Sequence, residues 1–315
     1  IKPPPETPEG DNPVEQYGAL QVIGIQLCDE KGNPVQLKGM STHGLQWMSK
    51  VQTKPAFQSL AEQWQCDVVR LALYIEEGGY NTKPESFRDK VETLAGYCEQ
   101  LGMYCVIDWH VMTPGNPLDE AYNGADAFFE WASAKFKNKK HIIYEICNEP
   151  NGKDVTWEVV KEYADRVIPI IRKNAPKSVI LCGNPSFSSQ LSEIVKDPLD
   201  YDNIMYTYHF YAATHLNYAN LSQYLDRLPV FVTEWGTCES NGSGSYNLSS
   251  AATWVDIMNG NNPGGQTVSW TNWNFSYGTG TADNLVTESV DKGIFNDVKQ
   301  PYGQFVRDKI RELSK

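Results

Sequence analysis

The chain has 315 residues, a formal net charge of −12 and a hydrophobic content of 41%, which allows a large buried core and excludes an intrinsically disordered protein. The acidic balance, without any run of basic residues, argues against nucleic acid or an anionic membrane as a partner. No segment approaches the roughly 18 consecutive apolar residues that a membrane-spanning helix needs.

The first part of the chain differs in composition from the rest. Residues 1–13 are rich in proline and acidic side chains, which is typical of an extended linker that tethers other modules. We expect one folded domain over residues 14–315. Within it, two alternating runs in residues 20–37 flank the turn sequence 29–34, so we expect an N-terminal β-hairpin.

Strands and helices then alternate. The expected strands are apolar or β-branched runs and cover residues 37–43, 67–74, 103–110, 142–148, 178–182, 203–209, 229–234 and 267–274. The clearest expected helices have apolar side chains at helical spacing and cover residues 53–64, 85–101, 125–136, 155–174, 251–258 and 301–313. Eight such rounds predict an α/β fold, a (β/α)8 TIM barrel with the hairpin before its first strand. A doubly wound sheet would need a glycine-rich turn after the first strand, and the sequence has none there.

The seven cysteines are scattered and form no C-x-x-C motif, which argues against a zinc ribbon. Four of them fall within apolar runs and are expected to be reduced and buried in the core: Cys98, Cys105, Cys147 and Cys182.

Two glutamates end two of the expected strands in the same way. Glu149 and Glu234 each follow an apolar run and precede residues that break a strand. Because the carboxyl ends of barrel strands meet at one rim, the two carboxylates are expected to face one groove. A lone strand-end glutamate is more often a surface residue, but two in matching contexts favour the carboxylate pair that glycoside hydrolysis needs.

Other strand ends also carry groups that can bind a substrate or transfer protons. They are His43, Arg70, Tyr74, His110, Asn148, His209, Tyr211, Trp270 and Trp273. Strict alternation predicts that Val230, Val232 and Glu234 share one side of their strand, and that Asp108 and His110 share one side of theirs.

Glu145 is expected on the same side as Glu149, deeper in the barrel. A buried carboxylate needs a cation or strong donors, and Arg70 and Lys38 are the candidates. We expect a structural role for Glu145.

Five motifs carry a resemblance to a known family. They are Asp108-Trp109-His110, Asn148-Glu149-Pro150, His209-Phe210-Tyr211, Thr233-Glu234-Trp235-Gly236 and Ser269-Trp270-Thr271-Asn272-Trp273. In this order and spacing, residues 20–312 resemble glycoside hydrolase family five, and more closely its bacterial endo-β-1,4-glucanases. The resemblance implies a retaining, double-displacement hydrolase that cleaves internal β-1,4-glucosidic bonds of cellulose or soluble β-glucan and needs no cofactor or metal. Since such a polymer cannot enter cells, the resemblance also implies a secreted protein.

The resemblance implies roles for the catalytic residues. Glu149 would be the general acid/base and Glu234 the nucleophile. Arg70 and Tyr211 would support Glu234, and Asn148 would hold the sugar 2-hydroxyl.

The remaining predicted site residues would contact the sugar chain. His110 and His209 would line the subsite of cleavage, with Trp273 as the platform under that sugar. The glycone side would use His43, Trp47 and Tyr74, and the leaving-group side would use Phe187. Many relatives carry a lysine shortly after the last tryptophan, where this chain has Phe275-Ser276-Tyr277-Gly278.

Three alternatives remain open from the sequence. The same mechanism could act on mixed-linkage glucan, xyloglucan, mannan or xylan, because one hydroxyl or methylene group discriminates only modestly. A non-catalytic carbohydrate-binding barrel would keep the aromatic residues but would be expected to lose one glutamate. A metal-dependent hydrolase could use four ligands: His43, His110, His209 and Asp108.

Overall fold

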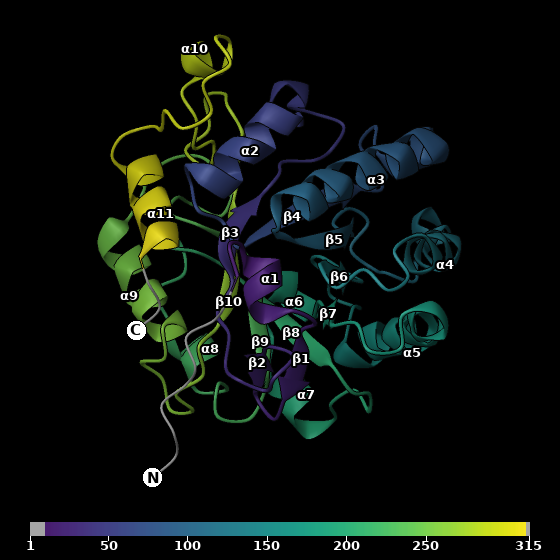
Figure 1. Ribbon diagram of the computed structural model, residues 1–315. Helices are drawn as coiled ribbons and strands as arrows, with labels where there is room; N and C mark the ends of the chain where they lie inside the picture. The colour runs from purple at the N-terminus through teal and green to yellow at the C-terminus, as the bar shows by residue number, and fades with distance from the viewer. Residues whose placement is uncertain (1–9, 313–315) are drawn as a thin grey trace.

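The computed structural model describes residues 10–312, and within this range the chain forms a closed barrel of eight parallel strands (Figure 1). The barrel strands are β3 (Lys38–Ser41), β4 (Val68–Tyr74), β5 (Tyr104–His110), β6 (Ile142–Glu145), β7 (Ile180–Cys182), β8 (Ile204–Tyr211), β9 (Val230–Gly236) and β10 (Ser269–Trp273). Pairing of β10 with β3 closes the barrel. The predicted (β/α)8 fold is therefore confirmed.

Helices surround the strands (Figure 1). The longer ones are α2 (Lys54–Glu62), α3 (Pro84–Leu101), α4 (Ala125–Lys135), α5 (Trp157–Asn174), α9 (Leu248–Met258) and α11 (Tyr302–Arg311). Short elements in the connections are η1 (Ser49–Val51), η2 (Tyr80–Thr82), η3 (Glu120–Tyr122), α6 (Pro185–Ser188), α7 (Ser192–Lys196), α8 (Ala219–Ser222) and α10 (Thr287–Val290). Within residues 10–312, no helix has both the length and the apolar character that crossing a membrane requires.

The N-terminal segment is attached to the barrel. Most of the predicted linker lies outside the described residues, but Asn12 caps α1 (Pro13–Tyr17) by accepting a hydrogen bond from the Glu15 amide at 3.0 Å. The Val14 amide donates to the Gly102 carbonyl at 3.1 Å. Within residues 10–312, regular structure thus begins at Pro13.

The predicted hairpin is present, but its turn was placed wrongly. Strands β1 (Gln21–Ile23) and β2 (Gln26–Cys28) pair with Ile23 opposite Gln26, so the chain reverses at Gly24, whose φ is +61°. The predicted turn 29–34 forms a second reversal, where Cys28 makes an isolated bridge with Pro34. The position of the turn was predicted wrongly because residues 24–25 lack the Asn-Gly or Asp-Gly signature of a two-residue turn.

The core has two layers. The larger cluster packs the outer face of the strands against the helices, and a smaller apolar cluster fills the barrel interior with side chains such as Val68, Val106 and Phe231. Leu20 and Leu27 belong to the inner cluster, so α1 and the hairpin cover the amino end of the barrel. All seven cysteines lie in the described range, and each is buried and free of a disulfide, as expected for the four named above.

Strand β9 departs from strict alternation. The pairs Thr207 with Phe231 and His209 with Glu234 show an extra residue in β9 relative to β8, and the register to β10 shifts at the same place. This is a β-bulge, which re-aims side chains. The prediction that Val230, Val232 and Glu234 share one side is wrong: the two valines pack in the outer cluster, whereas Glu234 lies in the site inside the rim.

Candidate active site

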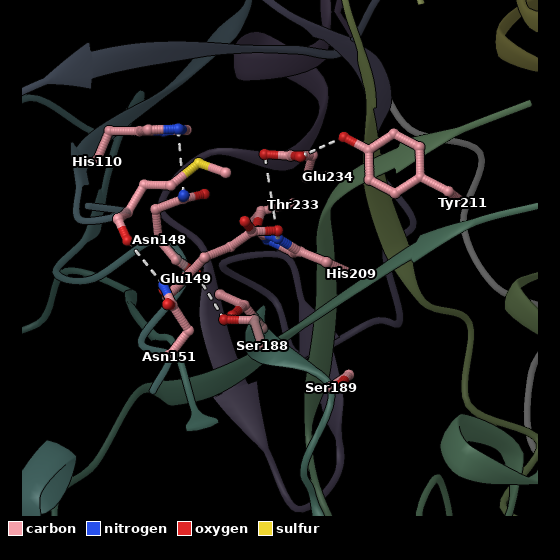
Figure 2. Close-up of polar contacts among 12 residues, drawn as sticks. His110, Asn148, Glu149, Asn151, Ser188, Ser189, His209, Tyr211, Thr233 and Glu234 are labelled. Atoms are coloured by element: carbon pink, nitrogen blue, oxygen red, sulfur yellow. Dashed lines mark hydrogen bonds and ion pairs between the residues drawn. The ribbon is translucent and has the colours of Figure 1, made fainter. Parts of the chain in front are cut away.

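The two predicted catalytic glutamates meet at the carboxyl rim of the barrel (Figure 2). Glu149 follows β6, and its amide donates to the Val111 carbonyl at 3.1 Å, so the chain continues beside β5 after regular strand pairing ends. Glu234 is placed by the bulge in β9. A carboxylate oxygen of each glutamate and a ring nitrogen of His209 all lie within 4.8 Å of one another. Retaining glycosidases place their two carboxyl groups about 5–5.5 Å apart, whereas inverting enzymes leave room for a water molecule.

Glu234 is surrounded by groups that favour its ionised form. The Tyr211 hydroxyl donates to its Oε1, and Arg70 Nη1 lies 3.4 Å from its Oε2. Burial raises the pKa of Glu234 and the neighbouring Glu149 adds to the rise, while His209 and Arg70 lower it. The direct contact with a guanidinium group distinguishes this carboxylate from Glu149.

Glu149 is buried, and its carboxyl group contacts no lysine or arginine among residues 10–312. Its Oε1 lies 2.8 Å from Nδ1 of His209, and burial raises its pKa to about 8, with Asp108 and Glu145 adding to the rise and Arg70 opposing it. Burial also lowers the pKa of His209 to about 4, so this imidazole is neutral at pH 7. Glu149 therefore holds a proton at neutral pH, as a general acid must.

Glu145 is the deepest carboxylate of the group and has its own counter-cation. Arg70 binds it with two contacts, Nε to Oε2 at 2.7 Å and Nη2 to Oε1 at 3.1 Å. Lys38 points elsewhere and donates to the Glu312 carbonyl. Of the two candidates, Arg70 is thus the partner of Glu145, and this bidentate pair orients the guanidinium toward the catalytic groups.

The side chain of Asn148 is fixed by three hydrogen-bonding groups. Its Oδ1 accepts from Arg70 Nη2 at 2.6 Å, and its Nδ2 donates to His110 Nε2 at 3.1 Å and to the Val111 carbonyl at 3.2 Å. His110 Nδ1 in turn donates to Asp108 Oδ2 at 2.5 Å. The amide of Asn148 is therefore held in one orientation at the rim beside Glu149.

The aromatic residues predicted for the glycone side form one cluster. His43 lies 5.2 Å from Trp47 and 5.1 Å from Trp273, measured between ring centroids. Tyr74 stacks on His110 at 4.0 Å, and Trp47 is 37% exposed. Flat apolar rings of this kind can cover the apolar faces of sugar rings. Trp270, also noted at a strand end, packs in the outer cluster instead.

Phe187 lies apart from that cluster. It is 50% exposed and lines a cavity of about 250 Å³ together with Glu149, His209, Tyr211 and His215. Its position is consistent with a contact to the leaving group.

Residues 274–286, the loop after β10, contain no lysine, and a lysine from a later segment reaches this loop. Lys299 Nζ donates to the carbonyls of Gly278 at 2.8 Å and Gly280 at 3.2 Å. This cation holds the backbone of the loop.

Thr233 was missed by the sequence reasoning. Its hydroxyl lies 2.8 Å from Glu145 Oε1 and 2.8 Å from His209 Nε2. Strict alternation points Thr233 and Glu234 to opposite sides, and only the bulge brings both into the site. No signal in a single sequence marks that bulge.

The chemistry of the donor set favours acid–base catalysis over metal binding. Among the described residues, the potential ligands that lie close together are Glu149, His209 and Glu234. The group does not include the other members of the predicted metal set, His43, His110 and Asp108. Both ring nitrogens of His209 and of His110 are already hydrogen bonded. A metal ion would have to displace these bonds and the proton of Glu149.

Several known proteins are similar to this chain. Endoglucanase E-5 of Thermobifida fusca is 43% identical over 287 residues, which cover 87% of this chain and 59% of that protein. Cellulase CelDZ1 of Thermoanaerobacterium sp is 39% identical, covering 94% of this chain and 82% of the relative. The chain thus spans about three fifths of the length of the first relative.

Solved structures show the same fold. The catalytic domain of Thermobifida fusca endoglucanase Cel5A (E5) superposes with a TM-score of 0.90 at 39% identity, covering 96% of this chain and all of that one. A variant of that domain has been solved in complex with cellotetraose. The sequence profile described as Cellulase (glycosyl hydrolase family 5) matches residues 28–278. The family resemblance is therefore confirmed: the chain belongs to glycosyl hydrolase family 5.

Proposed function

We propose that this chain is a retaining endo-β-1,4-glucanase that hydrolyses cellulose or soluble β-glucan. The observation that carries the proposal is the pair of buried carboxylates, Glu149 and Glu234, whose nearest oxygens lie within 4.8 Å. This spacing fits attack and protonation at one glycosidic bond. The names of the relatives and the cellotetraose complex of one of them support a β-1,4-glucan as substrate.

In the first step, the Glu234 carboxylate attacks the anomeric carbon while Glu149 protonates the leaving oxygen. Arg70 and the Tyr211 hydroxyl hold the attacking carboxylate in place and keep it ionised before attack. In the second step, Glu149, now ionised, removes a proton from the water that hydrolyses the glycosyl-enzyme ester. Asn148, fixed by Arg70 and His110, offers its amide to the sugar hydroxyl beside the reacting carbon.

The sugar chain would cross the rim between two aromatic walls. The cluster around Trp47, Tyr74 and Trp273 would hold the glycone side, and Phe187 the leaving-group side. Partial exposure of Trp47 and Phe187 at the two sides suits an open groove that accepts internal bonds.

We also propose that the domain acts outside the cell, because cellulose is too large to enter it, and that the proline-rich segment before Asn12 tethers it to other modules. Activity in the medium of the source organism, on a polypeptide larger than this domain, would support both points. Activity confined to cell extracts would argue against secretion.

The first experiment compares reducing-sugar release from carboxymethyl-cellulose, barley glucan, xyloglucan, xylan and glucomannan. We expect the highest rate on a β-1,4-glucan. A clear preference for xylan or mannan would change the substrate that we assign but would leave the proposed mechanism in place. Proton NMR of the first product should show the β anomer, since two displacements retain configuration. Activity that a chelator abolishes would favour a metal-dependent hydrolase.

The matched variants are Glu234→Gln and Glu239→Gln. Glu239 follows the same strand but accepts only a surface hydrogen bond from the Ser245 amide at 3.1 Å. The first variant should fold and lose turnover, and the second should keep it. Full activity of Glu234→Gln would refute the assignment of the nucleophile.

A further inference from the structure

Thr233 links the deepest ion pair of the site to the general acid. The bulge in β9 places its side chain inside the rim together with that of Glu234, and Thr233 is fully buried. Its hydroxyl oxygen, Oγ1, lies 2.8 Å from Glu145 Oε1 and 2.8 Å from His209 Nε2. The opposite ring nitrogen, Nδ1, lies 2.8 Å from Glu149 Oε1 (Figure 2).

A hydroxyl group has one hydrogen to donate, so the two contacts of Thr233 cannot both be donations. Arg70 binds both oxygens of Glu145 in a fork, which favours the ionised carboxylate, and an ionised carboxylate only accepts. The Thr233 hydrogen therefore points to Glu145, and the Thr233 oxygen must accept a hydrogen from His209.

This assignment determines the tautomer of His209. A neutral imidazole carries one hydrogen, and if it is on Nε2 then Nδ1 is a bare acceptor. The only hydrogen that can lie between Nδ1 and Glu149 Oε1 is then the carboxyl proton of Glu149. In the other tautomer, Nδ1 would donate to Glu149 and would stabilise its ionised form.

We propose that Thr233 is a positioning residue that holds His209 in the Nε2–H tautomer and thereby keeps Glu149 protonated for its role as general acid. The proposal deepens the function proposed above and rests on it. Thr233 is fully buried and does not line the cavity beside Phe187, so it acts through His209.

Other charged or titratable groups also face Glu149, from each strand around it. They are Arg70 and Tyr74 on β4, Asp108 on β5, Glu145 on β6, His209 and Tyr211 on β8, and Glu234 on β9. Their charges set the general level of the Glu149 pKa. The Thr233 hydroxyl carries no charge, so its effect can be separated from theirs by a substitution that leaves every charge in place.

The test compares Thr233→Val, which removes the hydroxyl but keeps the shape, with Thr233→Ser, which keeps the hydroxyl. Thr207→Val is the matched control, because Thr207 is buried on the adjacent strand β8 and its hydroxyl has no partner among residues 10–312. The readout is kcat/KM across pH for cellotetraose and for 2,4-dinitrophenyl β-cellobioside. The dinitrophenolate leaves without help from an acid, whereas the sugar hydroxyl does not.

In Thr233→Val, we expect the alkaline limb of the kcat/KM profile for cellotetraose to move about one pH unit toward acid. At pH values above that limb, kcat/KM should then be about tenfold lower than in the unchanged chain. The activated substrate should lose less than about twofold, because it does not need the proton of Glu149. Thr233→Ser and Thr207→Val should behave like the unchanged chain. An equal loss of kcat/KM on both substrates with an unmoved pH profile would overturn the proposal. Both substrates need the nucleophile, so that result would mean that the substitution had displaced Glu234 and had not changed the protonation of Glu149. Unchanged kinetics in Thr233→Val would overturn it as well.

A second measurement does not depend on activity or on any variant at Thr233. The chain has five histidines, and ¹⁵N-histidine labelling with a His209→Asn variant for assignment would identify the ring signals of His209. We expect a protonated Nε2 and a bare Nδ1 at neutral pH. A protonated Nδ1 would overturn the proposal while leaving the proposed function intact. The proposed function itself fails separately, if the unchanged chain releases no sugar from β-1,4-glucans or if Glu234→Gln stays active.

Discussion

The barrel interior has two layers of side chains. At the amino end the strands contribute apolar side chains, and two residues further along the same strands they contribute charged ones. Val68 is followed in this way by Arg70 on β4, and Val106 by Asp108 on β5. Ile143 is likewise followed by Glu145 on β6. The first layer is an apolar core, whereas in the second layer several carboxyl groups surround the guanidinium of Arg70.

The difference shows how the two layers depend on each other. Removing an ion from water costs several kcal/mol, and even a paired buried charge is weak evidence for stability. Asp108 Oδ1 has no hydrogen-bond partner among the described residues, so the charged layer is not fully satisfied. We infer that the apolar layer and the outer core stabilise the fold, and that the charged layer is retained for chemistry.

The largest effect is expected for the cation of the charged layer. Arg70→Met would leave Asp108, Glu145 and Glu234 without their shared counter-charge and should lower the free energy of unfolding by about 3–5 kcal/mol. Turnover should also be lost, because Glu234 and Asn148 lose their support. Denaturant unfolding at pH 7 measures the first effect.

The control for this variant is Arg166→Met. Arg166 forms an ion pair with Asp126 at 3.0 Å, but both side chains are partly exposed, so the change should stay within about 1 kcal/mol. If both arginine variants lose the same small amount, the charged layer does not depend on Arg70 and the comparison between the layers fails.

The next prediction concerns the apolar layer. Leu181 on β7 is fully buried in the inner cluster, and Leu181→Ala should lower the free energy of unfolding by about 2–5 kcal/mol through lost burial and a cavity. The kcat and its pH profile, measured well below the unfolding temperature, should stay unchanged. A shifted pH profile would mean that the apolar layer also tunes the carboxyl groups.

Most of this layered arrangement could be predicted from the sequence. Alternation along β5 correctly placed Asp108 and His110 on one side, and the two strand-end glutamates do face one groove. Glu145 was expected to be buried and to need a cation, and Arg70 supplies it. These predictions succeeded because the side chains of a regular strand alternate between its faces.

The failures occurred where the backbone leaves regular geometry. The bulge in β9 inserts one residue, which makes both Thr233 and Glu234 reach the site and reverses the expected sides of Val230 and Val232. Nothing in the run of apolar residues before Thr233 marks this position. The close approach of Lys299 to the loop after β10 depends on tertiary packing and has no local signal either.

A smaller effect, with a defined sign, is expected for Glu149→Gln. In the folded chain the pKa of Glu149 is raised to about 8, so between its ordinary value near 4.3 and about 8 the folded state binds more protons at this group than the unfolded state. The stability that this group contributes is therefore fully present at low pH and is lost as pH rises through about 8. Glutamine does not titrate, and its amide can donate to His209 as the carboxyl group does.

We expect the variant to gain stability relative to the unchanged chain as pH rises, by about 3–4 kcal/mol between pH 5 and pH 8. Thermal unfolding of both proteins at a series of pH values measures this difference. A difference that is constant with pH would show that Glu149 ionises as readily in the folded chain as in the unfolded one.

The smallest effect is expected at the turn that carries Phe187, at the leaving-group side of the charged layer. Ser186, Phe187 and Ser188 have φ values of 59°, 60° and 55°, a left-handed turn that costs residues with a side chain roughly 1–2 kcal/mol each. The turn is held by hydrogen bonds to the chain around Glu149: the Phe187 amide donates to the Pro150 carbonyl at 3.0 Å, and the Ser188 hydroxyl to the Asn148 carbonyl at 2.5 Å.

Phe187→Gly and Phe187→Ala both remove the ring, but only glycine relieves the backbone. Glycine should therefore be the more stable of the two by about 1 kcal/mol, while both lower kcat/KM for cellotetraose by the same few-fold factor. Thermal unfolding and steady-state kinetics of the pair separate backbone strain from ring contact. Equal stabilities would show that the turn is relaxed, and unequal kinetics would show that its conformation also matters to the substrate. With the expected outcome, backbone strain at this turn adds to the cost of the charged layer beside it, and the apolar layer offsets both.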